Sequence, residues 1–364
     1  MGEAAAEPAT KITSDLTPIN RWMYAIGGLL FAVLMALSTR YGFQRDELYF
    51  MDCARHLAAS YVDQPGFAPL LARVSLDLFG VSAPGLRVWP ALAAGAMTVI
   101  GGLTAREFGG GRRAQLLAAI GVATMPAVWG AAHVANTTAY EFVAWAGLAF
   151  VVARIGRTGE ARWWLAGGLA TGLGVADNHL MAFFALAIVV GVLLSGGGRQ
   201  LLNRWFVAGA AIALAGAMPD IWWQATHGWA TVAMTHALNG ENGGPANIPG
   251  WVIGQLFMVA VVWVWVWVAG LVRLWRSGRP LWRALAWAYA LLFGLFAVTT
   301  GGKIYYLAGA YVYLLAAGTV AVDGWLAAKR GRIRVLAVAT AVTAPIMAVP
   351  TLPCSSGPRL RGRC

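Results

Sequence analysis

Residues 22–49 read WMYAIGGLLFAVLMALSTRYGFQRDELY, and this stretch decides the fold. Its first part, residues 22–39, contains no charged residue and has the length of a membrane-anchoring helix, which needs about 17 residues or more. Asp46 and Glu47, two consecutive acids, follow after a short connection. The stretch predicts a membrane protein that presents acidic side chains directly after its first helix.

The composition of the whole chain supports a membrane location. Of the 364 residues, 59% are hydrophobic and only 12% are charged, whereas soluble domains contain about 25% charged residues. A helix satisfies its own backbone hydrogen bonds, so helices tolerate lipid as a solvent. We therefore predict an all-α, polytopic membrane protein.

Apolar runs long enough, or nearly long enough, to cross a bilayer recur along the chain. We predict about eleven transmembrane helices from them. The runs lie at 22–39, 88–105, 114–131, 139–153, 163–176, 180–195, 205–221, 250–272, 284–298, 305–322 and 335–350. Around Asp177, Asn178 and His179 we predict a tight hairpin whose polar turn reaches the outer surface.

The distribution of Lys and Arg gives the orientation. The net charge is +12, but the basic residues form short clusters between apolar runs, a pattern that argues against nucleic-acid binding. With the N-terminus in the cytoplasm, 18 of the 27 basic residues face the cytoplasm, as the positive-inside rule requires. We expect a membrane protein with a cytoplasmic tail at 1–21, a transmembrane domain at 22–350 and an atypical tail at 351–364.

Two outer loops are long on this topology. The first, residues 40–87, is expected to carry interfacial helices from Asp46 to about Ser60 and from about Pro69 to Phe79. The second, residues 222–249, is rich in Trp, Asn and Gly and contains no Lys or Arg. Its tryptophans suit the aromatic belt of a membrane interface.

Several classes of chemistry find no support. The three cysteines form no CxxC pair and have no zinc-ligand spacing with histidine. No P-loop or dinucleotide-binding glycine pattern is present, so ATP and nicotinamide chemistry are unsupported. The sequence requires no cofactor, and a divalent metal is possible, held by Asp46 and Glu141 if by any residues.

Ionisable residues that are hard to explain gather on the outer side. An acid such as Asp46 can simply cap an interfacial helix, and Glu141 can be a first-turn acid. Together with Glu47, however, they place three acids on one side, where paired acids can serve as a general base or hold a cation and a phosphate. We take Asp46, Glu47 and Glu141 as candidate catalytic residues.

Lys303 is the basic residue of the short outer loops, and it follows two glycines. A lysine there can snorkel to the interface, but a phosphate-binding role explains its position better. His179, next to Asp177, is either a hydrogen-bonded structural histidine or a site residue.

Motifs along the chain resemble the GT-C glycosyltransferases. The similarity is strongest to the bacterial branch related to protein mannosyltransferases and to the lipid A aminoarabinose transferase, which is glycosyltransferase family 39-like. The motifs span roughly residues 40–350 and, in order, are YGFQRDELY at 41–49, VDQP at 62–65, NTTAYEF at 136–142, PDIWWQ at 219–224 with HGW at 227–229, and GGKIYYL at 301–307.

The resemblance implies transfer of a sugar from a polyprenyl-phosphate donor to an acceptor at the extracytoplasmic face. Asp46 corresponds to the family's catalytic or acceptor-orienting acid, with Glu141 as a second acid nearby. Charge that develops on the donor phosphate would be stabilised by Lys303. The residues predicted to bind donor phosphate or substrate are Lys303, Tyr305, Tyr306, Asp63, Asn178, His179 and Arg45.

Two features depart from the family pattern. Relatives often carry Asn-Lys after the fifth helix, where this chain has Asn178-His179, and neutral histidine would offer a phosphate less positive charge. Relatives also usually continue beyond the last helix, so residues 351–364 indicate a natural short form or a truncated product.

Two other functions remain open. A transporter or lipid flippase would also be polytopic, but such proteins tend to show repeats and charged groups near the midplane. A structural membrane protein without chemistry would leave the one-sided acids unexplained. The partners expected for an enzyme are the polyprenyl-phosphate sugar donor, membrane lipids and an acceptor that the sequence does not identify.

Overall fold

A computed structural model describes residues 16–237, 248–299 and 303–348. In these residues the secondary structure is helical, apart from one isolated antiparallel bridge between Ser60 and Pro65. The all-α prediction is confirmed. The predicted tail at 351–364 lies outside the described residues, as does most of the tail at 1–21.

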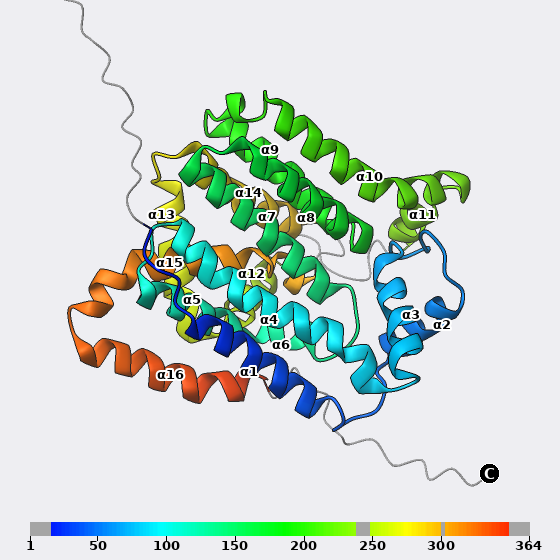
Figure 1. Cartoon of the computed structure of the whole chain (residues 1–364), viewed down its shortest axis with the longest axis horizontal. Coiled ribbons are helices and arrows are strands. Elements are labelled where there is room, and N and C mark those ends of the chain that lie inside the picture. Colours follow the sequence, from blue (N-terminus) through cyan, green and yellow to red (C-terminus); the bar gives the residue numbers. More distant parts are fainter. Residues whose placement is uncertain (1–15, 238–247, 300–302, 349–364) are drawn as a thin grey trace, which may run out of the picture.

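The first half of the chain supplies two loop helices and the helices around which the site is built (Figure 1). Their bounds are α1 Trp22–Leu37, α2 Arg45–Arg55, α3 Phe67–Phe79, α4 Ala83–Glu107, α5 Arg112–Ala123, α6 Pro126–Ala132, α7 Thr138–Thr158, a 3₁₀ turn η1 at Ala161–Trp163, and α8 Trp164–Asp177.

The second half completes the bundle. Its elements are α9 Leu180–Leu194, η2 Gly198–Gln200, α10 Arg204–Thr226, α11 Ala230–Ala237, α12 Ile248–Met258, η4 Val261–Trp263, α13 Val264–Trp275, α14 Pro280–Val298, η5 Ile304–Leu307, α15 Ala310–Ala327 and α16 Arg330–Ala348. Helix α15 lies at the centre, with nearly every residue of its first half buried.

Five of the described helices are long and apolar enough to cross a membrane, namely α4, α7, α10, α14 and α15. The number rises to seven if the bent pairs α5 with α6 and α12 with α13 each form one span. The chain is thus a polytopic helical membrane protein, but the predicted number of about eleven spans is not confirmed. Helix α1 has 16 residues and α9 has 15, and at 1.5 Å per residue such helices fall short of a 30 Å hydrocarbon core.

Both bends have a local cause. The pair α5 and α6 turns by 55° where Pro126 begins α6, because proline cannot donate the hydrogen bond that would continue the preceding helix. The pair α12 and α13 turns by 88°. There Ala260 adopts a positive φ of 62°, a conformation that interrupts a right-handed helix.

The predicted hairpin is present, but its turn differs from the prediction. Helices α8 and α9 are separated only by Asn178 and His179. Asp177 is the last residue of α8 and its side chain is completely buried, so the turn itself consists of Asn178 and His179. The position of this turn at the outer face stays a prediction.

Small residues make close packing of α8 on α10 possible. Gly168 and Gly172 of α8 lie against the backbone of Gly209 and Gly216 of α10, and a methyl group added at Gly168 would collide with the carbonyl of Gly209. Glycines at such spacing let helix backbones approach within a membrane, where packing replaces the hydrophobic effect.

The first long loop forms α2 and α3, as expected, although α2 ends at Arg55 and not near Ser60. These two helices and α11 lie together at one end of the molecule (Figure 1). A hydrogen bond from the Thr231 hydroxyl to the Val62 carbonyl, 2.8 Å long, joins α11 to the loop that connects α2 and α3.

Candidate active site

The start of α2 positions Asp46 and Glu47. Gln44 is the residue that caps this helix: its side-chain oxygen accepts from the Asp46 amide at 2.7 Å, and its own amide donates to Glu47 Oε2 at 2.9 Å. This reciprocal arrangement is a capping box. Asp46 is therefore not the cap, and its carboxylate lies in the first turn, where the helix dipole stabilises negative charge.

Glu47 is fully buried in an ion pair with Arg87 of α4. Its Oε1 accepts from Arg87 Nε at 2.7 Å and from the Ala135 amide at 3.1 Å. Its Oε2 accepts from Arg87 Nη2 at 2.7 Å as well as from Gln44. Both oxygens of Glu47 are thus occupied by protein donors, and the residue anchors α2 to two other segments.

Arg87 extends this anchor into the connection between α1 and α2. Its guanidinium donates to the carbonyls of Ser38 and Gly42, and it lies 4.1 Å from the centre of the Tyr41 ring. Sequence reasoning missed Arg87. A signal was available, because an arginine beside an apolar run is costly unless it has a partner.

Asp46 and Arg45, in contrast, face outward. Their side chains are 41% and 90% exposed, and Arg45 Nε lies 3.1 Å from Asp46 Oδ1. Exposed pairs of this kind contribute little to stability. The carboxylate of Asp46 is accessible to a substrate while the helix beneath it is fixed by Glu47.

Glu141 begins the second part of the site. It lies in the first turn of α7 and is buried, as is Asp177 at the end of α8. Glu141 Oε1 and both carboxylate oxygens of Asp177 have no hydrogen-bond partner among the described residues. Burying a polar group without a partner is unfavourable, so these acids are not retained for stability.

The turn after α8 is tied to the start of α7. Asn178 Nδ2 donates to the Thr137 hydroxyl at 3.3 Å, which holds Asp177 beside the first turn of α7. His179 pairs with neither Glu141 nor Asp177, but with a third acid. Its Nε2 lies 2.9 Å from Asp220 Oδ2, and Asp220 Oδ1 accepts from the Ser60 hydroxyl at 2.5 Å.

Tyr305 is influenced by the charges of acids from both parts of the site, Asp46 and Glu141. It lies in η5, and its pKa is raised to about 12, first by burial and then by the negative charges of Glu141 and Asp46. Burial also raises the pKa of Tyr306, as do the charges of Tyr305 and Glu141, whereas the positive charge of Lys303 lowers it. Lys303 is exposed, with its Nζ 5.9 Å from the centre of the Tyr305 ring.

The structure thus brings Asp46, Glu141, Lys303, Tyr305 and Tyr306 into one region. Asp63 lies elsewhere on the loop, where its Oδ1 accepts from the Tyr49 hydroxyl at 2.5 Å. The described residues contain no group of three His, Cys, Asp or Glu side chains that could hold a metal ion. A metal held by Asp46 and Glu141 remains a prediction.

Solved structures share this fold. The chain is similar to ArnT from Cupriavidus metallidurans bound to undecaprenyl phosphate, with a TM-score of 0.68 and 18% identity over 83% of this chain and 59% of that one. The apo structure of ArnT gives the same TM-score and identity over 92% and 65% of the two chains. The chain therefore spans about three fifths of the length of ArnT. The apo oligosaccharyltransferase of Archaeoglobus fulgidus matches with a TM-score of 0.56 and 12% identity, over 91% of this chain and 56% of that chain.

These similarities define the class: the chain is a multi-pass helical membrane protein with an ArnT-like fold. Residues 63–223 match the family model described as dolichyl-phosphate-mannose-protein mannosyltransferase. The resemblance to this family, inferred from the sequence motifs, is thereby confirmed. No curated protein sequence matches the chain.

Proposed function

We propose that the protein is a membrane glycosyltransferase that moves a sugar from a polyprenyl-phosphate-linked donor to an acceptor. The observation that carries the proposal is the arrangement of Asp46. Its carboxylate is accessible, and its helix is held by the buried pair of Glu47 and Arg87. The charges of Asp46 and Glu141 both act on Tyr305. Glu47 is then a positioning residue, whereas Asp46 contacts the substrate.

The reaction follows from these positions. Asp46 takes the proton of an acceptor hydroxyl as that oxygen bonds to the anomeric carbon of the sugar. The bond between the anomeric carbon and the phosphate oxygen breaks, and polyprenyl phosphate leaves with the bonding electron pair. Lys303 stabilises the negative charge on the departing phosphate. Tyr305 and Tyr306, protonated at neutral pH, donate hydrogen bonds to the substrate.

The proposal includes a location. The lipid tail of the donor stays in the bilayer, and its phosphate lies at the interface, where η5 would meet it. The charge distribution of the loops favours a cytoplasmic N-terminus and an extracytoplasmic site. We place the protein in a bacterial inner membrane, as the family resemblance implies. The ArnT structure bound to undecaprenyl phosphate supports a polyprenyl-phosphate donor.

Reconstituted protein tests the function. In proteoliposomes supplied with undecaprenyl-phosphate-linked radiolabelled sugar and a membrane extract as acceptor, we expect transfer by the wild type. Asp46→Asn should lower the rate by about 10²- to 10⁴-fold, the usual contribution of a general base. Asp77→Asn, which alters an exposed acid of α3, is the matched control and should transfer normally.

Normal transfer by Asp46→Asn would exclude Asp46 as the base. Uptake of a solute that depends on Asp46, without any transfer, would identify a transporter instead. Mass spectrometry of lipids that copurify with the wild type should find a polyprenyl-phosphate sugar, which would also identify the sugar.

A further inference from the structure

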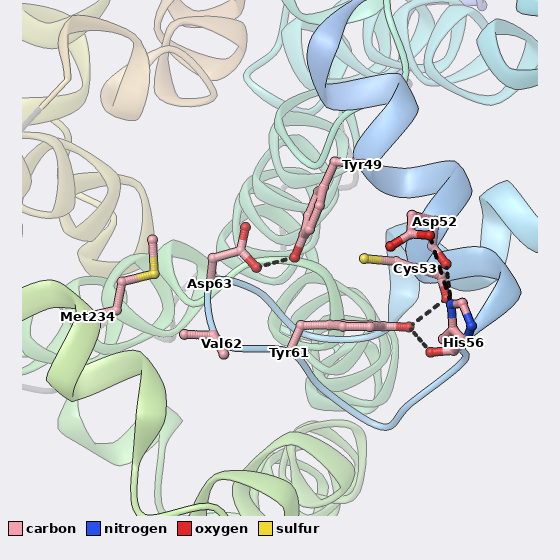
Figure 2. A pocket seen from close by; sticks show the side chains of 8 residues that line it. All are labelled: Tyr49, Asp52, Cys53, His56, Tyr61, Val62, Asp63 and Met234. Carbon is pink, nitrogen blue, oxygen red and sulfur yellow. Dashed lines mark hydrogen bonds and ion pairs between the residues drawn. The ribbon is translucent and has the colours of Figure 1, made fainter.

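A groove of about 590 Å³ opens beside α2, between this helix, the loop after it and α11 (Figure 2). Its volume falls within the range of small-molecule sites, about 300–1,000 Å³. Tyr49, Asp52, Tyr61 and Asp63 line it, with Met234 on the opposite side. Nothing in the reaction described above uses this groove.

The groove lies in line with Asp46. Tyr49 and Cys53 line it, and they follow Asp46 by three and seven residues, a spacing that places all three on one face of a helix. At 1.5 Å per residue, Tyr49 lies three residues, about 4.5 Å along the axis, from Asp46. The groove therefore lies along the face of α2 that also carries the proposed base.

The charged residues that line the groove favour one chemical class of acceptor over another. Asp52 and Asp63 provide carboxylates, and His56 adds a ring whose Nδ1 lies 3.9 Å from Asp52 Oδ1. None of the lining residues is Lys or Arg. Carboxylates only accept hydrogen bonds, so they favour a ligand that donates them. They also repel a phosphate, and an acceptor whose nucleophile is a phosphate would fit poorly.

The tyrosines add flat apolar surface with polar edges. The Tyr49 hydroxyl is bonded to Asp63, and the Tyr61 hydroxyl donates to the carbonyls of Cys53 and His56. These bonds fix both rings along the groove, as Figure 2 shows. A ligand with many hydroxyl groups and apolar C–H faces matches fixed rings flanked by carboxylates.

We propose that this groove binds the acceptor as a neutral, hydroxyl-rich carbohydrate headgroup and directs one of its hydroxyls to Asp46. The inference deepens the proposed glycosyl transfer and rests on it for the identity of the ligand as acceptor. A neutral acceptor with a hydroxyl nucleophile also explains why a base is needed at Asp46, since a phosphate acceptor requires none.

Filling the groove tests the proposal. Met234 is 36% exposed and lines the groove, whereas Val232, on the same helix, is 50% exposed and does not. Binding of radiolabelled octyl glucoside and octyl phosphate is measured for the protein in lipid nanodiscs. Met234→Trp should weaken glucoside binding at least tenfold, while Val232→Trp should bind it within twofold of the wild type.

The wild type should bind octyl glucoside at least tenfold more tightly than octyl phosphate. Equal binding of the two, no binding of the glucoside, or unchanged binding by Met234→Trp would overturn the proposal. So would loss of undecaprenyl phosphate binding in Met234→Trp, because the groove would then serve the donor. If the glucoside binds as expected but the wild type transfers no sugar, the groove is a carbohydrate-binding site and the proposed glycosyltransferase function is wrong.

Discussion

Arg87 holds the carboxylate of Glu47 with two parallel hydrogen bonds, Nε to Oε1 and Nη2 to Oε2, each 2.7 Å long. Both side chains are buried. Such bidentate pairs combine strength with a fixed geometry. Here the geometry sets the direction in which α2 leaves its cap, and thereby the position of the neighbouring Asp46.

Arg87→Ala should therefore be strongly destabilising. It leaves Glu47 as a buried charge without its counterion, a change that costs about 3–5 kcal/mol. Arg87→Lys should recover only part of this loss, because an ammonium group cannot form the two-pronged contact. Thermal unfolding in detergent micelles measures the effect. Arg73→Ala, which removes an exposed pair with Asp77, is the control, and equal melting temperatures for all variants would contradict the assignment.

Asp177→Asn should separate stability from activity. Because both oxygens of Asp177 are buried without a hydrogen-bond partner among the described residues, a neutral side chain of the same shape should leave the melting temperature equal or raise it. Transfer should fall at least tenfold, since Asp177 is held beside the first turn of α7, which carries Glu141. Glu107→Gln is the contrasting change. Its carboxylate is buried too, but it pairs with Arg154 at 2.9 Å and Arg157 at 2.6 Å, so this variant should lose stability. A lower melting temperature for Asp177→Asn would show that Asp177 is structural.

Lys303→Met should weaken binding of the donor. A hydrogen bond to a charged group contributes about 1.5–3 kcal/mol, which corresponds to a rise in the donor KM of roughly 10- to 100-fold. Lys329→Met, which removes a lysine next to the end of α15, should leave the donor KM unchanged. The titration uses undecaprenyl-phosphate sugar in proteoliposomes, and an unaltered KM for Lys303→Met would remove this residue from the site.

Tyr305 should make stability depend on pH at the alkaline end. Burial raises its pKa to about 12, so the folded protein retains a proton that the unfolded chain loses near pH 10. The stabilising contribution is complete below pH 10 and is lost as the pH rises towards 12. Between pH 8 and 11 the melting temperature of the wild type should fall more steeply than that of Tyr305→Phe. Parallel curves would show that Tyr305 is not shielded from solvent.

The helices could be predicted well from the sequence because a long apolar run directly indicates a helix that is buried or surrounded by lipid. The predicted number of about eleven spans is not confirmed, because apolar character does not reveal where a helix is short or bent, as at Pro126 and Ala260. The order of the motifs selected Asp46 and Glu141 as candidate catalytic residues, a role that stays a prediction. Their different surroundings, one accessible and one buried, depend on packing that a single sequence does not show.

Contacts between distant segments were the part that sequence could not supply. Glu47 was predicted to be catalytic, and its pairing with Arg87 of α4 became apparent only from the fold. The burial of Asp177 was likewise not apparent from the sequence. It depends on the turn after α8 meeting the start of α7, where Asn178 bonds to Thr137.

The bond between Ser60 and Asp220 sets an order of events during synthesis, since the two residues are 160 positions apart in the chain. At about 5–20 residues per second, a ribosome needs on the order of 10–30 seconds to proceed from one to the other. During that interval the loop after α2 has neither Asp220 nor α11 to hold it, while Arg87, only 40 positions after Glu47, has already been made. The start of α2 can therefore settle early, and the far side of the groove is completed only when α10 and α11 emerge.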